Sequence, residues 1–113
     1  IKERGYFYMK LLVFYDIVET RNRNNIVYTL ESYSFYRVQK SVFMGNINEN
    51  KYKTFQIELS RQVAATDLLY IVPLSEYSFK NIMTLGHSIY PELLLLKRNE
   101  FDFKDIVIWK IRA

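Results

Sequence analysis

The stretch Lys10–Asp16, KLLVFYD, decides the fold of this chain, because it is an unbroken apolar run that ends on one acidic residue. Leu11–Tyr15 is too short to span a membrane and has no helical period, so the pattern predicts a β-strand. A strand that is apolar at every position needs cover on both faces of its sheet. Asp16 follows where this buried strand reaches the surface, which is a usual place for a functional residue in a sheet.

The composition is that of one globular domain. The chain has 113 residues, of which 50% are hydrophobic and 25% are charged, so a sizeable core fits and a second domain does not. The formal charge of +4 permits phosphate binding without requiring it. The chain has no cysteine and a single histidine, His87, which excludes a disulfide and a multi-histidine zinc site. Any metal would therefore have oxygen ligands, and we assign no chemistry to His87.

The chain is expected to have three parts. Residues 1–8 precede Met9, and we expect them to be an N-terminal extension before a native start at Met9. Residues 9–86 are expected to form the domain, and residues 87–113 a C-terminal extension. The apolar run lacks the small-residue cleavage site of a signal peptide, so the expected compartment is the cytoplasm.

Two segments show the period of amphipathic helices. The first is predicted over Arg21–Tyr33 with Thr20 as its N-cap, and the second begins after Asn48 as its N-cap. Each has apolar residues at helical spacing. These stripes are Ile26, Leu30 and Tyr33 in the first, and Phe55, Leu59 and Val63 in the second.

Four further segments are predicted as strands. Tyr36–Gly45 is predicted to be one alternating strand, with a core face that holds Val38, Val42 and Met44 and a polar face that holds Arg37, Ser41 and Phe43. Asp67–Pro73 is predicted to be a second interior strand that proline ends. Ile82–Leu85 and Ile106–Ile111 are shorter candidates, and Leu93–Leu96 is expected to form a helical turn.

This order of elements predicts an α+β fold, a ferredoxin-like βαββαβ sandwich whose antiparallel sheet has two helices on one face. Two helices leave the other face bare, although Leu11–Tyr15 and Leu68–Val72 are apolar on both faces. The simplest cover is a second copy of the same sheet. We therefore expect a homodimer in which the two copies of Asp16 meet or share a cleft.

Three strings in the sequence closely resemble one known family, that of CRISPR-associated protein two. They are VFYDI at Val13–Ile17, RVQKSVFMG at Arg37–Gly45 and IVP at Ile71–Pro73, with Arg23 between the first two. The match runs from about Met9 to Gly86, and Ile106–Trp109 is similar to the closing strand of the family. The resemblance implies a ferredoxin-like homodimer in which an extra C-terminal strand completes the partner's sheet.

The resemblance implies two functions. The first is CRISPR adaptation, in which the dimer is a platform that grips the backbone of the DNA duplex destined to become a spacer, beside the integrase, CRISPR-associated protein one. The second is a metal-dependent endonuclease on single-stranded RNA or double-stranded DNA, with Tyr15 and Asp16 as catalytic residues and Asp16 as the ligand of Mg²⁺ or Mn²⁺. We favour the platform as the physiological role, because one carboxylate per chain supplies few metal ligands.

Basic residues are the candidates for phosphate contacts. Arg21 and Arg23 lie in the first turn of the predicted helix, where the helix dipole disfavours cations unless they meet an external phosphate. A phosphate contact and an ion pair across the dimer are equally expected for Arg37. The full set of nucleic-acid-binding candidates is Arg21, Arg23, Arg37, Lys97 and Arg98.

The resemblance also implies supporting or interface roles for Ser41 and Phe43, and packing at an interface is expected of Phe43 rather than base stacking. Some members of the family carry a second basic residue where this chain has Asn25. That difference weakens the expectation of full nuclease activity.

Overall fold

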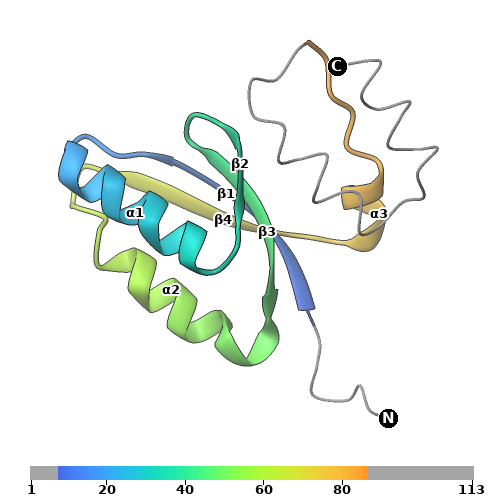
Figure 1. The fold of residues 1–113 in the computed structure, drawn as a ribbon, viewed down its shortest axis with the longest axis horizontal. Coiled ribbons are helices and arrows are strands. Elements are labelled where there is room, and N and C mark those ends of the chain that lie inside the picture. The colour runs from blue at the N-terminus through green and yellow to red at the C-terminus, as the bar shows by residue number, and fades with distance from the viewer. Residues whose placement is uncertain (1–7, 87–113) are drawn as a thin grey trace.

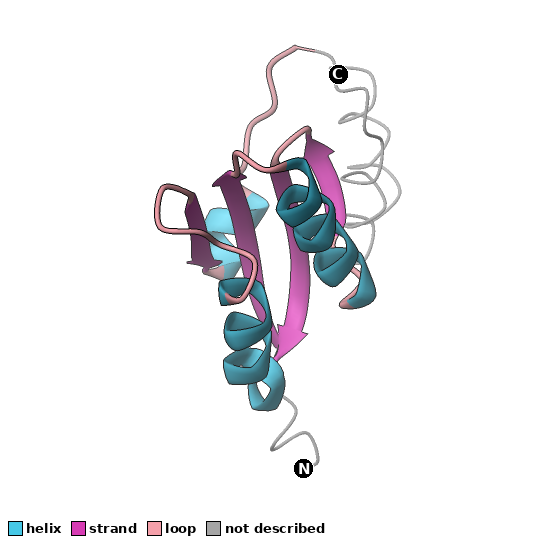
Figure 2. Ribbon diagram, turned by 90° about the vertical axis from the view of Figure 1, so that its left-hand side faces the viewer, coloured by secondary structure: helices cyan, strands magenta, loops and turns pink. Residues whose placement is uncertain are grey.

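The computed structural model describes residues 8–86, which form one antiparallel sheet with helices packed against it (Figures 1 and 2). The spatial order of the strands is β2-β3-β1-β4, which is the ferredoxin-like arrangement that the sequence predicts. The strands are β1 (Tyr8–Asp16), β2 (Tyr36–Gln39), β3 (Val42–Asn48) and β4 (Leu68–Leu74). The helices are α1 (Thr20–Ser32), α2 (Tyr52–Ser60) and α3 (Glu76–Lys80), with a 3₁₀ turn at Glu49–Lys51 before α2. The predicted elements at Leu93–Leu96 and Ile106–Ile111 lie outside the described residues.

The two faces of the sheet differ in their cover, and we name them the helix face and the open face. Leu11, Val13 and Tyr15 of β1 are buried on the helix face, under α1 and α2. Leu12 and Phe14 alternate with them and point to the open face, where they are only half-buried. Among the described residues, the apolar run in β1 therefore has full cover on one face only.

The helix face holds the main core, in which aromatic rings join α2 to the chain after α1. The ring centroids of Phe35 and Phe55 lie 5.1 Å apart, and the two rings are stacked. Phe35 lies against the backbone of β3 at Gly45, where an added Cβ would come within 2.6 Å of the ring. Only glycine leaves room for the ring in this position.

The end of α1 is a Schellman motif, which explains how the chain turns from the helix into β2. Ser34 has a left-handed backbone with φ of 65°. The N–H of Ser34 donates to the carbonyl of Glu31 over 2.9 Å, and the N–H of Phe35 donates to the carbonyl of Leu30 over 3.0 Å. Both Leu30 and Phe35 are buried in the same core cluster, and this is the apolar contact that usually accompanies the motif.

At the start of α1 the structure corrects the predicted cap. Glu19 is the N-cap residue and makes no hydrogen bond through its side chain, whereas Thr20 is already helical. The prediction for the second helix is confirmed in part, since Asn48 accepts a hydrogen bond from the N–H of Asn50 over 2.8 Å and caps the 3₁₀ turn that leads into α2.

The segment predicted as one strand, Tyr36–Gly45, is wrong, because the chain reverses there. β2 and β3 pair as an antiparallel hairpin around Lys40 and Ser41, with Arg37 opposite Phe43. The prediction failed because these two turn residues include none of the glycine, asparagine or aspartate that usually mark a hairpin. The predicted core face is right for Met44, which is buried against Phe79, but Val38 and Val42 on the same face are only half-buried. Phe43, predicted on the polar face, is fully buried under the helices.

β4 lies at the edge of the described sheet, and the strand that would make it an interior strand, predicted at Ile106–Ile111, lies outside the described residues. Pro73 does not end the strand but lies within it, opposite Leu11. Proline is tolerated in an edge strand because one side of that strand makes no ladder hydrogen bonds.

The predicted strand at Ile82–Leu85 is also wrong, because the chain forms α3 before it and has no regular structure there. Ser75 caps α3 by accepting a hydrogen bond from the N–H of Ser78 over 2.9 Å. Phe79 of α3 is buried against Met44 on the open face. Lys10 of β1 fixes this contact with an ion pair to Glu76, at 3.1 Å, and with its ammonium 5.3 Å from the centre of the Phe79 ring. Among the described residues, no helix has the length and apolar character that crossing a membrane requires.

Candidate active site at the end of β1

Asp16 lies at the last position of β1, on the open face of the sheet. It is exposed, and its register partner across the strand pair is Leu68 of β4. Two side chains beside it form an aromatic stack, because the rings of Phe14 and Tyr70 lie 4.8 Å apart and nearly parallel. Leu68 is 58% exposed and Tyr70 is 50% exposed. The carboxylate therefore borders an apolar surface that residues 8–86 leave exposed.

Tyr15 faces the opposite way from Asp16, into the helix face. It is 7% exposed, and its ring stacks on Phe43 with the centroids 6.4 Å apart. The phenol is thus separated from the Asp16 carboxylate by the thickness of the sheet. In this arrangement Tyr15 packs the strand that carries Asp16, and the predicted catalytic role does not follow from its position.

Arg23 is held by the loop between β1 and α1. One guanidinium nitrogen, Nη1, donates to the carbonyl of Ile17 over 3.0 Å and to the carbonyl of Val18 over 3.1 Å. The other, Nη2, donates to the hydroxyl of Thr20 over 2.9 Å. The predicted phosphate contact of Arg23 competes with these bonds, so its first role is to hold the loop that follows Asp16.

Asp67 is a residue of this site that the sequence analysis did not single out. It is 7% exposed, and its Oδ1 accepts a hydrogen bond from the N–H of Val18 over 3.0 Å. Its Oδ2 accepts from the N–H of Ala64 over 2.9 Å. The only signal in the sequence is an acidic residue directly before an apolar strand, which is a common position for a turn residue.

Arg37, Ser41 and Phe43 gather on one side of Tyr15. The Arg37 guanidinium lies 5.2 Å from the centre of the Phe43 ring, and the Ser41 carbonyl accepts a hydrogen bond from the N–H of Tyr15 over 3.2 Å. Phe43 is fully buried within the single chain, so it supports β1 from below and is not available to a partner. These residues support the strand that ends at Asp16.

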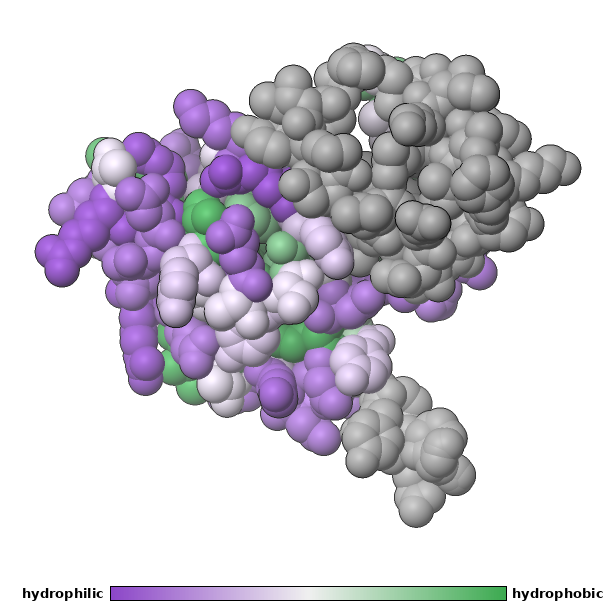
Figure 3. Space-filling model, viewed as in Figure 1, coloured by the Kyte–Doolittle hydropathy of each residue, from purple (hydrophilic) through white to green (hydrophobic). Residues whose placement is uncertain are grey.

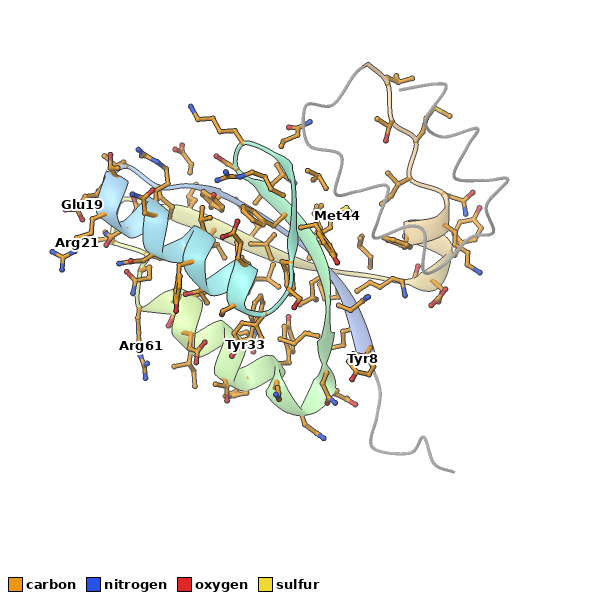
Figure 4. All side chains as sticks on the ribbon, viewed as in Figure 1. Tyr8, Glu19, Arg21, Tyr33, Met44 and Arg61 are labelled. Carbon is orange, nitrogen blue, oxygen red and sulfur yellow. The ribbon has the colours of Figure 1, made fainter. Side chains whose placement is uncertain are left out.

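Two arginines project from the end of the molecule where α1 begins and α2 ends. Figure 4 shows Arg21 and Arg61 pointing outward there, and both are exposed. Arg61 was not predicted, and a cation at the C-terminal end of a helix agrees with the helix dipole. Figure 3 shows that hydrophilic side chains cover most of this side of the molecule.

Asn25, where some members of the family carry a basic residue, connects α1 to the chain just after α2. The Asn25 amide of α1 donates to Gln62, just beyond α2, over 3.1 Å. The predicted phosphate ligands Lys97 and Arg98 lie outside the described residues, as does His87.

The chemistry of Asp16 fits a hard cation in part. Within residues 8–86 the structure brings no three histidine, aspartate or glutamate side chains together as metal ligands. A carboxylate oxygen is a ligand that Mg²⁺ prefers, and Mg²⁺ usually keeps several waters and uses one or two carboxylates. Asp16 is one such carboxylate, so the described residues fit this kind of site only in part.

Comparison with curated proteins gives two relatives of the same name. One is "CRISPR-associated endoribonuclease Cas2 1" of Methanospirillum hungatei JF-1, 34% identical over 62 residues, which are 55% of this chain and 65% of the relative. The other is "CRISPR-associated endoribonuclease Cas2 2" of Pyrobaculum aerophilum, 40% identical over 53 residues, which are 47% of this chain and 58% of the relative. The chain thus spans less than two thirds of the length of these relatives.

Solved structures share the fold. The hypothetical protein TT1823 of Thermus thermophilus superimposes with a TM-score of 0.64 at 26% identity, over 73% of this chain and 95% of that one. A structure described as "Crystal structure of cas2" superimposes with a TM-score of 0.58 at 25% identity, over 74% of this chain and 92% of that one. The family described as "CRISPR associated protein Cas2" matches residues 9–82, more than half of the chain and all of the site around Asp16. This chain therefore belongs to the CRISPR-associated Cas2 family.

Proposed function

We propose that this protein is a metal-dependent endoribonuclease that works as a homodimer through Asp16. The observation that carries the proposal is the position of Asp16, an exposed carboxylate at the end of a buried strand, on a loop that Arg23 and Asp67 hold. The endoribonuclease names of the two relatives support RNA as the substrate. This choice reverses the preference drawn from the sequence, because the predicted phosphate contact Arg23 is engaged within the chain.

The proposal needs a second copy of the chain, and the open face is where it would lie. Phe14, Leu68 and Tyr70 expose apolar surface beside Asp16. Covering these side chains with the same surface of a partner would bury them and bring two copies of Asp16 to one cleft. The free edge of β4 is open to one more strand, and Ile106–Ile111 of the partner is the proposed one.

The two carboxylates would share one Mg²⁺ or Mn²⁺. Such an ion lowers the pKa of a bound water and offsets charge on the reacting phosphate. The role of Asp16 in this chain is to hold a full negative charge at a fixed place on the surface. Arg21, exposed at the same end of the molecule, would attract the backbone of the RNA without reading its sequence.

Replacing Asp16 with asparagine tests the proposal. Asp16→Asn keeps the shape of the side chain but removes its charge, so cleavage of a single-stranded RNA in Mg²⁺ or Mn²⁺ should fall to the level seen with a chelator. The matched control is Glu19→Gln, which removes one negative charge three positions away, from an exposed side chain that makes no capping hydrogen bond. We expect Glu19→Gln to cleave as the original protein does, and cleavage that persists in Asp16→Asn would contradict the proposal.

A second candidate is the spacer-capture platform, in which the dimer grips a DNA duplex beside the integrase in the cytoplasm. The observation that favours it is the pair of exposed arginines, Arg21 and Arg61, on a chain with a formal charge of +4. Platform binding needs phosphate contacts and no metal at Asp16. The same Asp16→Asn protein, combined with the integrase, should therefore still support spacer insertion, and loss of insertion in a folded dimer would remove this candidate.

A further inference from the structure

We propose that Asp67 is a positioning residue for Asp16: together with Arg23 it fixes the Ile17–Val18 peptide, one residue beyond Asp16, and so restricts the backbone that directs the Asp16 carboxylate. This inference rests on the proposed function, because it concerns how Asp16 is presented to the metal and the RNA. Asp67 does not itself lie on the open face, since it precedes β4 and is almost fully buried.

One peptide unit carries the argument. Its carbonyl, that of Ile17, accepts from the Arg23 guanidinium over 3.0 Å, and its N–H, that of Val18, donates to the Asp67 carboxylate over 3.0 Å. The cation thus meets the negative end of the peptide dipole and the anion meets the positive end. Hydrogen bonds with one charged partner are about twice as strong as those between neutral groups. The Ile17–Val18 peptide, the second peptide beyond Asp16, is therefore held at both its carbonyl and its N–H.

Asp67 connects this peptide to a rigid part of the molecule. Its second carboxylate oxygen accepts from the N–H of Ala64 over 2.9 Å, and its own N–H donates to the Ala64 carbonyl over 3.0 Å. The turn before β4 is thereby closed around the carboxylate. Ile17, between Asp16 and the held peptide, is only 3% exposed and packs in the main core.

The need for such a device follows from the exposure of Asp16. An exposed side chain gains little from packing, so its position depends on the backbone that carries it. A site shared between two chains works only if each ligand is held to about 0.5 Å. Partners that orient a ligand from behind typically change metal affinity or activity by about 10- to 100-fold when they are replaced.

The experiment compares Asp67→Asn with the original full-length protein. Asparagine has the same volume, but its amide nitrogen would face a backbone N–H in place of an acceptor oxygen. We expect the backbone order parameters of residues 16–19 to fall from about 0.85 to below about 0.6, measured by NMR relaxation without metal. We expect kcat for RNA to fall by about 10- to 100-fold while KM changes less than about twofold, because Asp67 does not touch the substrate.

The control for general loss of stability is Ile47→Val, at the far end of β1, where Ile47 pairs with Met9. Each protein is assayed at the same interval below its own melting temperature. Ile47→Val should leave both the order parameters and kcat unchanged. If Asp67→Asn does not fold, hydrogen exchange of the original protein decides the matter, because the amides of Val18 and Ala64 must then be protected.

The outcomes separate this inference from the proposed function. The claim that Asp67 fixes the Ile17–Val18 peptide would be wrong if residues 16–19 stay ordered in Asp67→Asn. It would also be wrong if the Val18 amide of the original protein exchanges without protection. Lost order with unchanged kcat would reduce Asp67 to a structural residue. If the original protein shows no cleavage that depends on Asp16, the proposed function fails, and the order parameters still decide whether Asp67 holds the loop.

Discussion

At the scale of single residues, Tyr15 and Asp16 point to opposite faces of the sheet at the end of β1. Tyr15 points into the helix face and is buried, while Asp16 points to the open face and is exposed. The alternation of side chains along a strand requires this opposition. The buried Tyr15 ring therefore packs the end of β1 into the core, and the Asp16 carboxylate is exposed to solvent without entering the core.

Gly45 gives a prediction at this scale. Gly45→Ala would place a Cβ 2.6 Å from the Phe35 ring, so the ring must move within a full core. We expect the free energy of unfolding in urea to fall by about 1–3 kcal/mol, the usual cost of overpacking. The double variant with Phe35→Leu should lose less than the sum of the two single losses, since the smaller side chain relieves the overlap. Additive losses would mean that the ring is not what excludes a side chain at Gly45.

Sequence reasoning singled out Asp16 as a candidate but not Asp67, and the difference has a physical reason. A charged residue at the end of an apolar run can be recognised from the sequence alone. The partners of Asp67 are backbone N–H groups, one of them 49 positions away at Val18, and backbone groups leave no mark in a sequence. Arg23 was found for its charge, while its partners, again backbone carbonyls, could not be foreseen.

At the scale of elements, α1 and α2 pack through an aromatic and acidic contact that should depend on pH. The Tyr33 and Phe55 rings meet edge to face at 5.0 Å. Burial raises the pKa of the Tyr33 phenol above its usual value near 10, and a hydrogen bond to Glu58 and the charge of Glu58 raise it further. The neutral phenol is thus the form that the fold prefers.

The pH prediction follows from that shift. Because the folded pKa of Tyr33 is above the unfolded one, its contribution to stability is complete below about pH 10 and is lost as the pH rises through the folded pKa. Urea unfolding from pH 8 to 12 should therefore show a smaller alkaline loss in Tyr33→Phe than in the original protein. Glu58→Gln should lower the pKa of Tyr33 in an NMR titration, and an unchanged value would remove Glu58 as a cause.

The elements that sequence patterns predicted best are those with long apolar periods. β1, α1 and β4 were found near their true bounds, because burial of a strand or of one helix face imposes a regular spacing. The β2–β3 hairpin was missed because a register shift between Arg37 and Gln39 keeps the alternation of side chains in phase across the two-residue turn of Lys40 and Ser41. α3 was missed because it is five residues long, too short for a period to be seen.

At the scale of the whole molecule, the homodimer that we propose depends on the open face. Replacing Tyr70 on that face with serine should weaken the homodimer about tenfold or more, since exposed aromatic side chains often dominate interfaces. Tyr28→Ser is the matched control, because Tyr28 is 74% exposed on α1, on the other side of the sheet. Sedimentation over a range of concentrations measures both, and equal effects would place the dimer elsewhere. The sequence predicted this face through the doubly apolar strands, although it could not show which side the helices cover.

The central position of β1 has a consequence for how the protein is made. Of the described strands β1 is the first to be synthesised, but its two neighbours are Val42–Asn48 and Leu68–Leu74, far later in the chain. At a usual rate of synthesis of about 5–20 residues per second, one edge of this apolar strand stays unpaired for a second or more, and the other for several seconds. During that interval KLLVFYD is an apolar segment with unpaired backbone groups, which can aggregate with other chains. The nascent chain therefore exposes more apolar strand surface to chaperones than the folded protein does.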